Sequence, residues 1–174
     1  MVVLYFVTKR VSERRPTEAV PAVEPDAPAS RVLVLANETV EGRELLEELR
    51  SIDRAGRAEY FVCVPANPID TGTAMYEGAV YMWDATVQAA QERLDRTLAV
   101  LRSENLEARG ELGSFKPLKA LEDAVGEFRP DRLVICTLPE DRSAWLRFDI
   151  VDRAREMYRL PVTHVVVNPQ TVPA

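Results

Sequence analysis

The chain has 174 residues, with 22 Lys or Arg and 28 Asp or Glu, which gives a formal net charge of -6 at pH 7. A hydrophobic share of 47% is enough for one globular domain with a core. The acidic balance lacks the cationic excess that nucleic-acid binding requires, and a single histidine, His164, argues against histidine-based catalysis and histidine-rich metal sites.

The first 30 residues differ in composition from the rest of the chain. Residues 1–15 join an apolar run, Val2 to Val7, to a basic cluster, and residues 16–30 form a linker of proline, alanine and acidic residues. The apolar run is shorter than the roughly 18–20 residues of a membrane helix, so it is either an accessory strand or loose end, or the cytosolic border of a truncated anchor. We expect a cytoplasmic chain, with this stretch as the one part that could associate with a membrane, in the case that it is a truncated anchor.

From Arg31 onward, β-branched runs alternate with segments whose apolar residues recur at helical spacing. This pattern predicts an α/β domain over residues 31–174, with an open, doubly wound, five-stranded parallel sheet and flanking helices. The expected strands are residues 31–36, 60–64, a short and weak one at 107–112, 132–136 and 162–167. The expected helices are one that ends near Gly56, a long one after about Trp83, one from Pro117, and one marked by Ile150, Val151, Ala154 and Met157.

The segments that follow the strands are where we expect a ligand, because open parallel sheets bind ligands beyond the carboxyl ends of their strands. The longest, Pro65 to Trp83, is predicted to be irregular, with its apolar residues buried instead of forming a lid. Its tripeptide Asp70-Thr71-Gly72 also occurs in aspartic proteases, but a three-residue match in an α/β pattern is weak evidence for that activity. His164, Cys63 and Cys136 lie within strands, where a buried, hydrogen-bonded imidazole and inert core thiols are expected.

Over residues 31–174, the order and spacing of these elements resemble the universal stress protein family. The residues that carry the resemblance are Val32 to Asn37, Tyr60 to Val64, Gln91 to Leu94, Gly113, Asp131 to Ile135 and Pro161 to Val167. The resemblance implies the parallel-sheet fold, an ATP site in some members, and a homodimer with contacts through the last strand, here Val162 to Val167.

The loop after the fourth strand departs from the family pattern. ATP-binding members carry Gly-x-x-Gly there and, nine residues on, Gly-Ser or Gly-Thr, because the triphosphate needs close backbone approach and free amides at a helix start. In this chain residues 137–147 contain no glycine, and all 7 glycines lie at or before Gly126. The sequence therefore predicts that ATP is not bound in the usual family manner.

Other side chains could serve an adenine nucleotide in the same region. Arg142 and Arg147 could bind phosphate through their guanidinium groups, and Ser143 could cap the helix that follows. The resemblance places Asn37 near the adenine or ribose and the backbone of Val64 against the adenine. Purely structural roles, such as an ion pair of Arg142 with a neighbouring carboxylate, remain open for these residues. The candidate cofactor-binding residues are Asn37, Val64, Thr137, Arg142, Ser143 and Arg147.

The sequence contains no dedicated nucleotide-hydrolysis motif and no catalytic constellation. We therefore expect a non-enzymatic regulatory or interaction module that resembles universal stress proteins, forms a homodimer, contacts protein partners and binds no nucleic acid. Two alternatives remain. One is an adenine-nucleotide-binding stress protein with an altered phosphate loop, which takes ATP or another adenine nucleotide with Mg²⁺ and hydrolyses it weakly at most. The other is the soluble regulatory domain of a membrane-linked protein.

Overall fold

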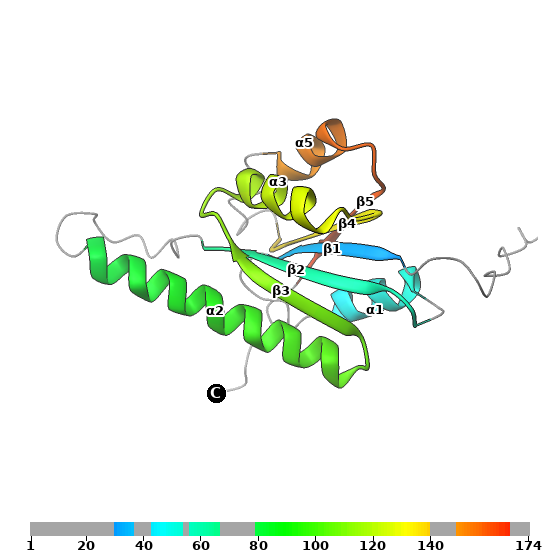
Figure 1. The fold of residues 1–174 in the computed structure, drawn as a ribbon, viewed down its shortest axis with the longest axis horizontal. Coiled ribbons are helices and arrows are strands. Elements are labelled where there is room, and N and C mark those ends of the chain that lie inside the picture. Colours follow the sequence, from blue (N-terminus) through cyan, green and yellow to red (C-terminus); the bar gives the residue numbers. More distant parts are fainter. Residues whose placement is uncertain (1–29, 37–42, 54–55, 67–78, 140–148, 168–174) are drawn as a thin grey trace, which may run out of the picture.

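The computed structural model describes residues 30–36, 43–53, 56–66, 79–139 and 149–167, with side chains in its longest helix from Ala85 onward. These residues form a five-stranded parallel sheet with helices on both faces, as the sequence predicts (Figure 1). In chain order the elements are β1 (Arg31–Ala36), α1 (Arg43–Ile52), β2 (Glu59–Pro65), α2 (Ala79–Ser103), β3 (Glu107–Gly113), α3 (Pro117–Phe128), β4 (Arg132–Thr137), α5 (Ile150–Met157) and β5 (Val162–Val166).

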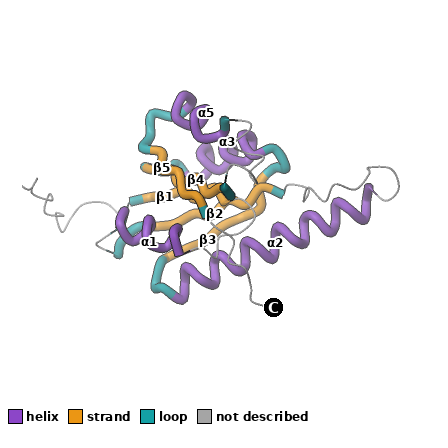
Figure 2. Tube along the Cα trace, turned by 180° about the vertical axis from the view of Figure 1, so that it is seen from behind, coloured by secondary structure: helices purple, strands orange, loops and turns teal. Residues whose placement is uncertain are grey.

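The strands lie in the order β3-β2-β1-β4-β5. The chain moves outward from β1 to β2 and β3, then returns to place β4 beside β1 and ends the sheet with β5. Helices α1 and α2 cover one face, and helices α3 and α5 cover the other (Figures 1 and 2). The sheet is therefore doubly wound, and β3 and β5 are its two edge strands.

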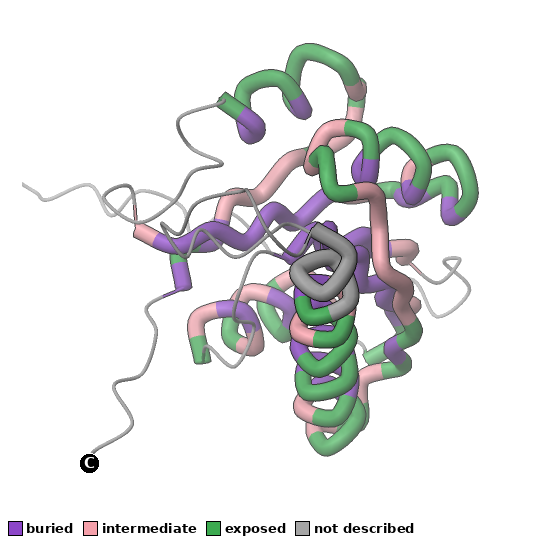
Figure 3. The backbone as a smooth tube through the Cα atoms, turned by 90° about the vertical axis from the view of Figure 1, so that its left-hand side faces the viewer, coloured by how far each residue is buried: buried purple, intermediate pink, exposed green. Residues whose placement is uncertain are grey.

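Strand β1 is buried on both faces because it lies in the middle of the sheet. Its residues Val32 to Ala36 have no exposed surface, which explains why the run is continuously apolar. Val32 and Val34 pack toward α1 and α2, whereas Leu33 and Leu35 pack toward α3 and α5. Figure 3 shows the result, with buried strands inside and the exposed sides of the helices outside.

Two elements differ from the sequence-based expectation. Helix α2 begins at Ala79, directly after Gly78, so residues 79–83 are helical and the predicted irregular stretch up to Trp83 was too long. Strand β3 is not short, since it pairs with β2 over its whole length from Glu107 to Gly113. As an edge strand it needs fewer apolar residues than a central one, which is why its sequence pattern is weak. The Asp70-Thr71-Gly72 tripeptide lies outside the described residues.

A charged cluster covers the amino end of the sheet on the α3 face. Glu59 on β2 accepts a hydrogen bond of 3.0 Å from Arg109 on β3 and lies 3.6 Å from Arg31 on β1. The Arg31 guanidinium lies 4.5 Å from the ring centroid of Phe128, and that of Arg109 lies 5.1 Å from the centroid of Phe61. The two rings stack at 5.1 Å, so the cluster joins the β3 edge to the aromatic core.

Candidate functional site

The sheet has one point where the direction of winding reverses, and it lies between β1 and β4. These strands are parallel neighbours, with Ala36 aligned with Cys136 near their carboxyl ends. Strand β1 is followed by α1 on one face, and β4 is followed by α5 on the other. Doubly wound sheets bind ligands beyond the carboxyl ends of the strands at such a switch point.

The structure places two of the six candidate residues, and both lie at this edge. Val64 is on β2 with its side chain in the core on the α1 and α2 face and 1% exposed, so only its backbone is available to a ligand. Thr137 is the last residue of β4 and is also 1% exposed. Strand β1 separates the two positions. The remaining candidates, Asn37, Arg142, Ser143 and Arg147, lie outside the described residues.

Thr137 is hydrogen-bonded to the single histidine of the chain. Its Oγ1 lies 2.7 Å from Nε2 of His164 on β5. In the β4–β5 register, Thr137 is opposite Val166 and His164 is opposite Ile135, so the two side chains are diagonal neighbours on one face of the sheet. The sequence predicted a buried, hydrogen-bonded histidine, and the hydrogen bond is present although His164 is only partly buried. Its partner was not predicted, because the pairing depends on the strand register.

The environment of His164 keeps its imidazole neutral at pH 7. Burial lowers the pKa of His164 below 6.5, and the Arg155 guanidinium lowers it further, whereas the Asp152 carboxylate raises it. Arg155 and Asp152 both lie on α5 and are joined by an ion pair of 3.0 Å. A hydroxyl beside a neutral imidazole is also the geometry of a nucleophile and its base, but Thr137 is only 1% exposed.

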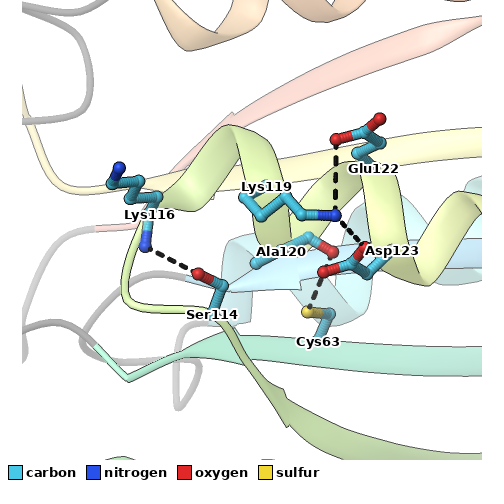
Figure 4. A network of polar contacts seen from close by, with 7 residues as sticks. All are labelled: Cys63, Ser114, Lys116, Lys119, Ala120, Glu122 and Asp123. Carbon is cyan, nitrogen blue, oxygen red and sulfur yellow. Dashed lines mark hydrogen bonds and ion pairs between the residues drawn. The ribbon is translucent and has the colours of Figure 1, made fainter.

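The turn between β3 and α3 brings a helix start to the same edge of the sheet. A Cβ at Gly113 would lie 2.5 Å from Cβ of Ala120 and 2.8 Å from Sγ of Cys63, so only glycine allows α3 to approach β2 and β3 this closely. Figure 4 shows the turn, in which the backbone N–H of Lys116 donates to Oγ of Ser114 at 3.3 Å. Sequence reasoning had used Gly113 only as a family marker, and its packing role follows from the structure.

The two cysteines are inert core residues, as the sequence predicts. Cys63 and Cys136 lie on opposite faces of the sheet with 0% and 1% exposure. Burial raises the pKa of each thiol to about 12, and Glu111 and Asp123 add to this effect at Cys63. Neither thiol forms a disulfide, and neither is a thiolate at neutral pH.

Strand β5 is an edge strand of the described sheet and differs in chemistry from β3. Strand β5 reads Val-Thr-His-Val-Val and carries no acidic residue, lysine or arginine. Val166 is 39% exposed at the end of this strand, and Met157 at the end of α5 is 52% exposed, although the sequence pattern grouped it with the buried residues of that helix. The neutral side chains and exposed apolar surface distinguish this edge from the charged β3 edge.

The part of the chain that the structure describes contains neither a cluster of metal ligands nor a membrane-spanning helix. Over those residues, no group of three or more His, Cys, Asp and Glu side chains could hold a metal ion. None of the helices described has the length and apolar character needed to cross a membrane.

No protein-family model and no curated protein sequence matches the chain. Solved structures do share its fold. A universal stress protein family protein from Burkholderia pseudomallei is 17% identical, with a TM-score of 0.56 over 78% of this chain and 94% of its own. One from Arabidopsis thaliana with AMP bound is 15% identical, with a TM-score of 0.57 over 83% and 96%. A universal stress protein in complex with cAMP is 14% identical, with a TM-score of 0.51 over 81% and 99%.

The alignment with this chain covers 94% to 99% of the length of these structures, so the likeness concerns the complete fold and not one motif. The chain has the architecture of universal stress proteins, and the predicted fold resemblance is confirmed. At identities of 14% to 17% the likeness extends to the fold alone.

Proposed function

We propose that this protein is a non-enzymatic regulatory module that binds an adenine nucleotide at the carboxyl edge of β1 and β4 and works as a homodimer. The observation that supports the nucleotide most strongly is the position of the switch point between β1 and β4 in a fold shared with an AMP-bound and a cAMP-bound structure. Under this proposal the ligand contacts the backbone at Val64 and the segment that follows Thr137.

The proposed ligand is a nucleoside monophosphate instead of ATP. The segment 137–147 contains no glycine, so it lacks the close backbone approach that holds a triphosphate. Arg142 and Arg147 supply two guanidinium groups in the same segment, which suits a single phosphate group. The side chains of Asn37 and Ser143 complete the proposed contacts to ribose and phosphate.

Two features support a regulatory instead of a catalytic role. The hydroxyl that comes closest to a catalytic nucleophile, that of Thr137 beside His164, belongs to a residue that is only 1% exposed. Both thiols are buried with raised pKa values of about 12. A module of this kind acts by changing its contacts with partners when the nucleotide is bound, as ligands shift the populations of protein states.

The dimer is proposed from the resemblance to universal stress proteins, and the chemistry of the sheet edges supports it. Strand β5 presents an uncharged edge with the apolar side chain of Val166 exposed, and unprotected edges of this kind pair with another strand. A second copy of the same chain is the partner that supplies an identical edge, as required for a two-fold interface.

Calorimetric titration of the full chain with AMP, adenosine and ATP with Mg²⁺ tests the nucleotide proposal. We expect micromolar affinity for AMP, at least tenfold weaker binding of adenosine, and no gain for ATP. The double variant R142E/R147E should lose at least tenfold in AMP affinity. Arg129→Glu, at an exposed position beyond the end of α3, is the matched control and should bind normally. Absence of AMP binding, or binding that survives the double charge reversal, would contradict the proposed site and leave the interaction module.

A further inference from the structure

The end of β4 is the point at which the sheet meets the proposed nucleotide site. Cys136 is aligned with Ala36 of β1, and Thr137 follows as the last residue of the strand. The segment that the proposed function assigns to the ligand begins directly after it, with Leu138 and Pro139. The position of Thr137 therefore determines where this segment leaves the sheet.

Thr137 is held from the side of β5 by both its backbone and its side chain. The N–H of Val167, directly after β5, donates to the Thr137 carbonyl at 2.8 Å. The Thr137 hydroxyl oxygen lies 2.7 Å from Nε2 of His164, which among the described residues is the one hydrogen-bond partner of this hydroxyl. Because Thr137 is only 1% exposed, water can hardly replace that partner.

The chemistry of the two groups sets the direction of this hydrogen bond when the ring is neutral. The hydroxyl hydrogen needs an acceptor, and Nε2 is an acceptor if the single hydrogen of the neutral imidazole lies on Nδ1. In this tautomer Thr137 donates and His164 accepts. A protonated imidazole carries hydrogens on both nitrogens, so the hydroxyl hydrogen then loses its acceptor. A buried donor without an acceptor is costly, which favours a rearrangement of Thr137.

We infer that His164 is a positioning residue for the proposed nucleotide site: its neutral imidazole fixes Thr137 at the end of β4, and protonation of the ring weakens nucleotide binding. This inference rests on the proposed function and adds to it one residue and a dependence on protons. Contacts between a nucleotide and the chain after Thr137 exist only in the complex, so a rearrangement of Thr137 disturbs them only there. By reciprocity, the nucleotide lowers the proton affinity of His164.

The charged groups around the imidazole make the sign of this linkage informative. Among the described residues, α5 places Arg155 and Asp152 near the ring, whereas the β4 neighbours Ile135 and Thr137 carry no titrating group. Burial and Arg155 lower the pKa of His164, and Asp152 raises it, so the ring is neutral at pH 7. The phosphate of a nucleotide attracts a protonated ring and opposes the proposed effect. A pKa that falls on binding therefore indicates positioning and not charge attraction.

Proton NMR of the untagged full chain tests the linkage in the wild-type protein. His164 is the single histidine, so its imidazole resonances are identified without variants. We expect its pKa to be below 6.5 in the free protein and lower by about 0.5 in the presence of saturating AMP, equivalent to about threefold weaker binding to the protonated ring. A pKa that rises or stays unchanged on AMP binding overturns the inference. Absence of AMP binding contradicts the proposed function, and the inference with it.

Calorimetric titration with AMP at pH 8, and at one pH unit below the measured pKa of His164, assigns the effect to the hydrogen bond. AMP itself takes up a proton near pH 6, so each protein is compared with His164→Gln, which can accept the same hydrogen bond without titrating. The AMP affinity of the wild-type chain should fall at least twofold more than that of His164→Gln between the two pH values.

Two substitutions of Thr137 separate the hydroxyl from the shape of the side chain. Thr137→Val keeps a β-branched side chain and removes the hydroxyl, so its pH dependence should match that of His164→Gln. Thr137→Ser keeps the hydroxyl and should restore the pH dependence of the wild-type chain. Equal pH dependence in all four proteins, with AMP bound in each, overturns the positioning role while leaving the nucleotide site intact.

Discussion

The two edge strands of the sheet differ in chemistry although they occupy equivalent positions. Strand β3 carries Glu107, Arg109 and Glu111 along its length, and Arg109 is tied to Glu59 on the neighbouring strand. Strand β5 carries no acidic residue, lysine or arginine, and its last residue, Val166, is exposed. Charged residues on an edge strand oppose pairing with another chain. The comparison teaches that, among the described residues, the β3 edge carries charges that oppose pairing with another chain and the β5 edge carries none.

Placing a charge on β5 should have the largest effect on this difference. Val166→Lys removes an apolar contact from both copies and adds a cation near His164, so we expect the dissociation constant of the dimer to rise at least 100-fold, equivalent to about 2.7 kcal/mol. Sedimentation velocity over a concentration series measures the change. Glu107→Lys, on the exposed β3 edge, is the control and should leave self-association unaltered. An unchanged dimer in Val166→Lys would show that assembly uses another surface.

Substitutions on the β3 side of the molecule should change the free energy of unfolding and not self-association. Phe128 is 1% exposed, stacks on Phe61 and lies beneath the Arg31 and Arg109 guanidinium groups. Phe128→Ala should lower the free energy of unfolding by about 3–5 kcal/mol, as large-to-small changes of buried aromatic residues do. Urea denaturation gives this value. Phe115→Ala, at a residue 48% exposed after β3, is the matched control and should cost below about 1 kcal/mol.

On β3 itself, removing the charge of Glu111 should raise the free energy of unfolding slightly. Burial raises the pKa of Glu111 above 4.5, Glu127 and Asp123 raise it further, and Arg109 lowers it. A carboxyl with a raised folded-state pKa destabilises the fold when it is ionised, so its cost is present at pH 7 and disappears below 4.5, where the folded and unfolded states are both protonated.

Glu111→Gln should therefore stabilise the protein at pH 7 by less than about 1 kcal/mol, because solvent screens this partly exposed site. The same substitution should have no effect at pH 4. Thermal unfolding at the two pH values checks both statements. A lower melting temperature for Glu111→Gln at pH 7 would mean that the attraction to Arg109 outweighs the repulsion by the α3 carboxylates.

The fold was predictable because its central elements have unambiguous patterns. Val32 to Ala36 form a continuous apolar run, and such a run fits a strand that is covered on both faces. The weak pattern of β3 and the early start of α2 were harder to predict. At an edge strand charged residues replace apolar ones, and local composition near Gly78 does not distinguish a loop from the first turn of a helix.

The site was less predictable than the fold, since it depends on which residues the sheet brings together. The sequence identified Thr137 by its position after a predicted strand and Val64 through the family resemblance, and the structure places both at one edge. The hydrogen bond between Thr137 and His164 joins residues 27 positions apart, and it depends on the β4–β5 register.

The central claim is that the protein self-associates through the β5 edge of the sheet and not through the β3 edge. Sedimentation equilibrium of the full wild-type chain at pH 8 tests it most directly, with Val166→Lys and Glu107→Lys measured in parallel. The account predicts a dimer for the wild-type chain and for Glu107→Lys, and a monomer for Val166→Lys at the same concentrations. A wild-type monomer, or a dimer lost in Glu107→Lys and retained in Val166→Lys, would contradict it.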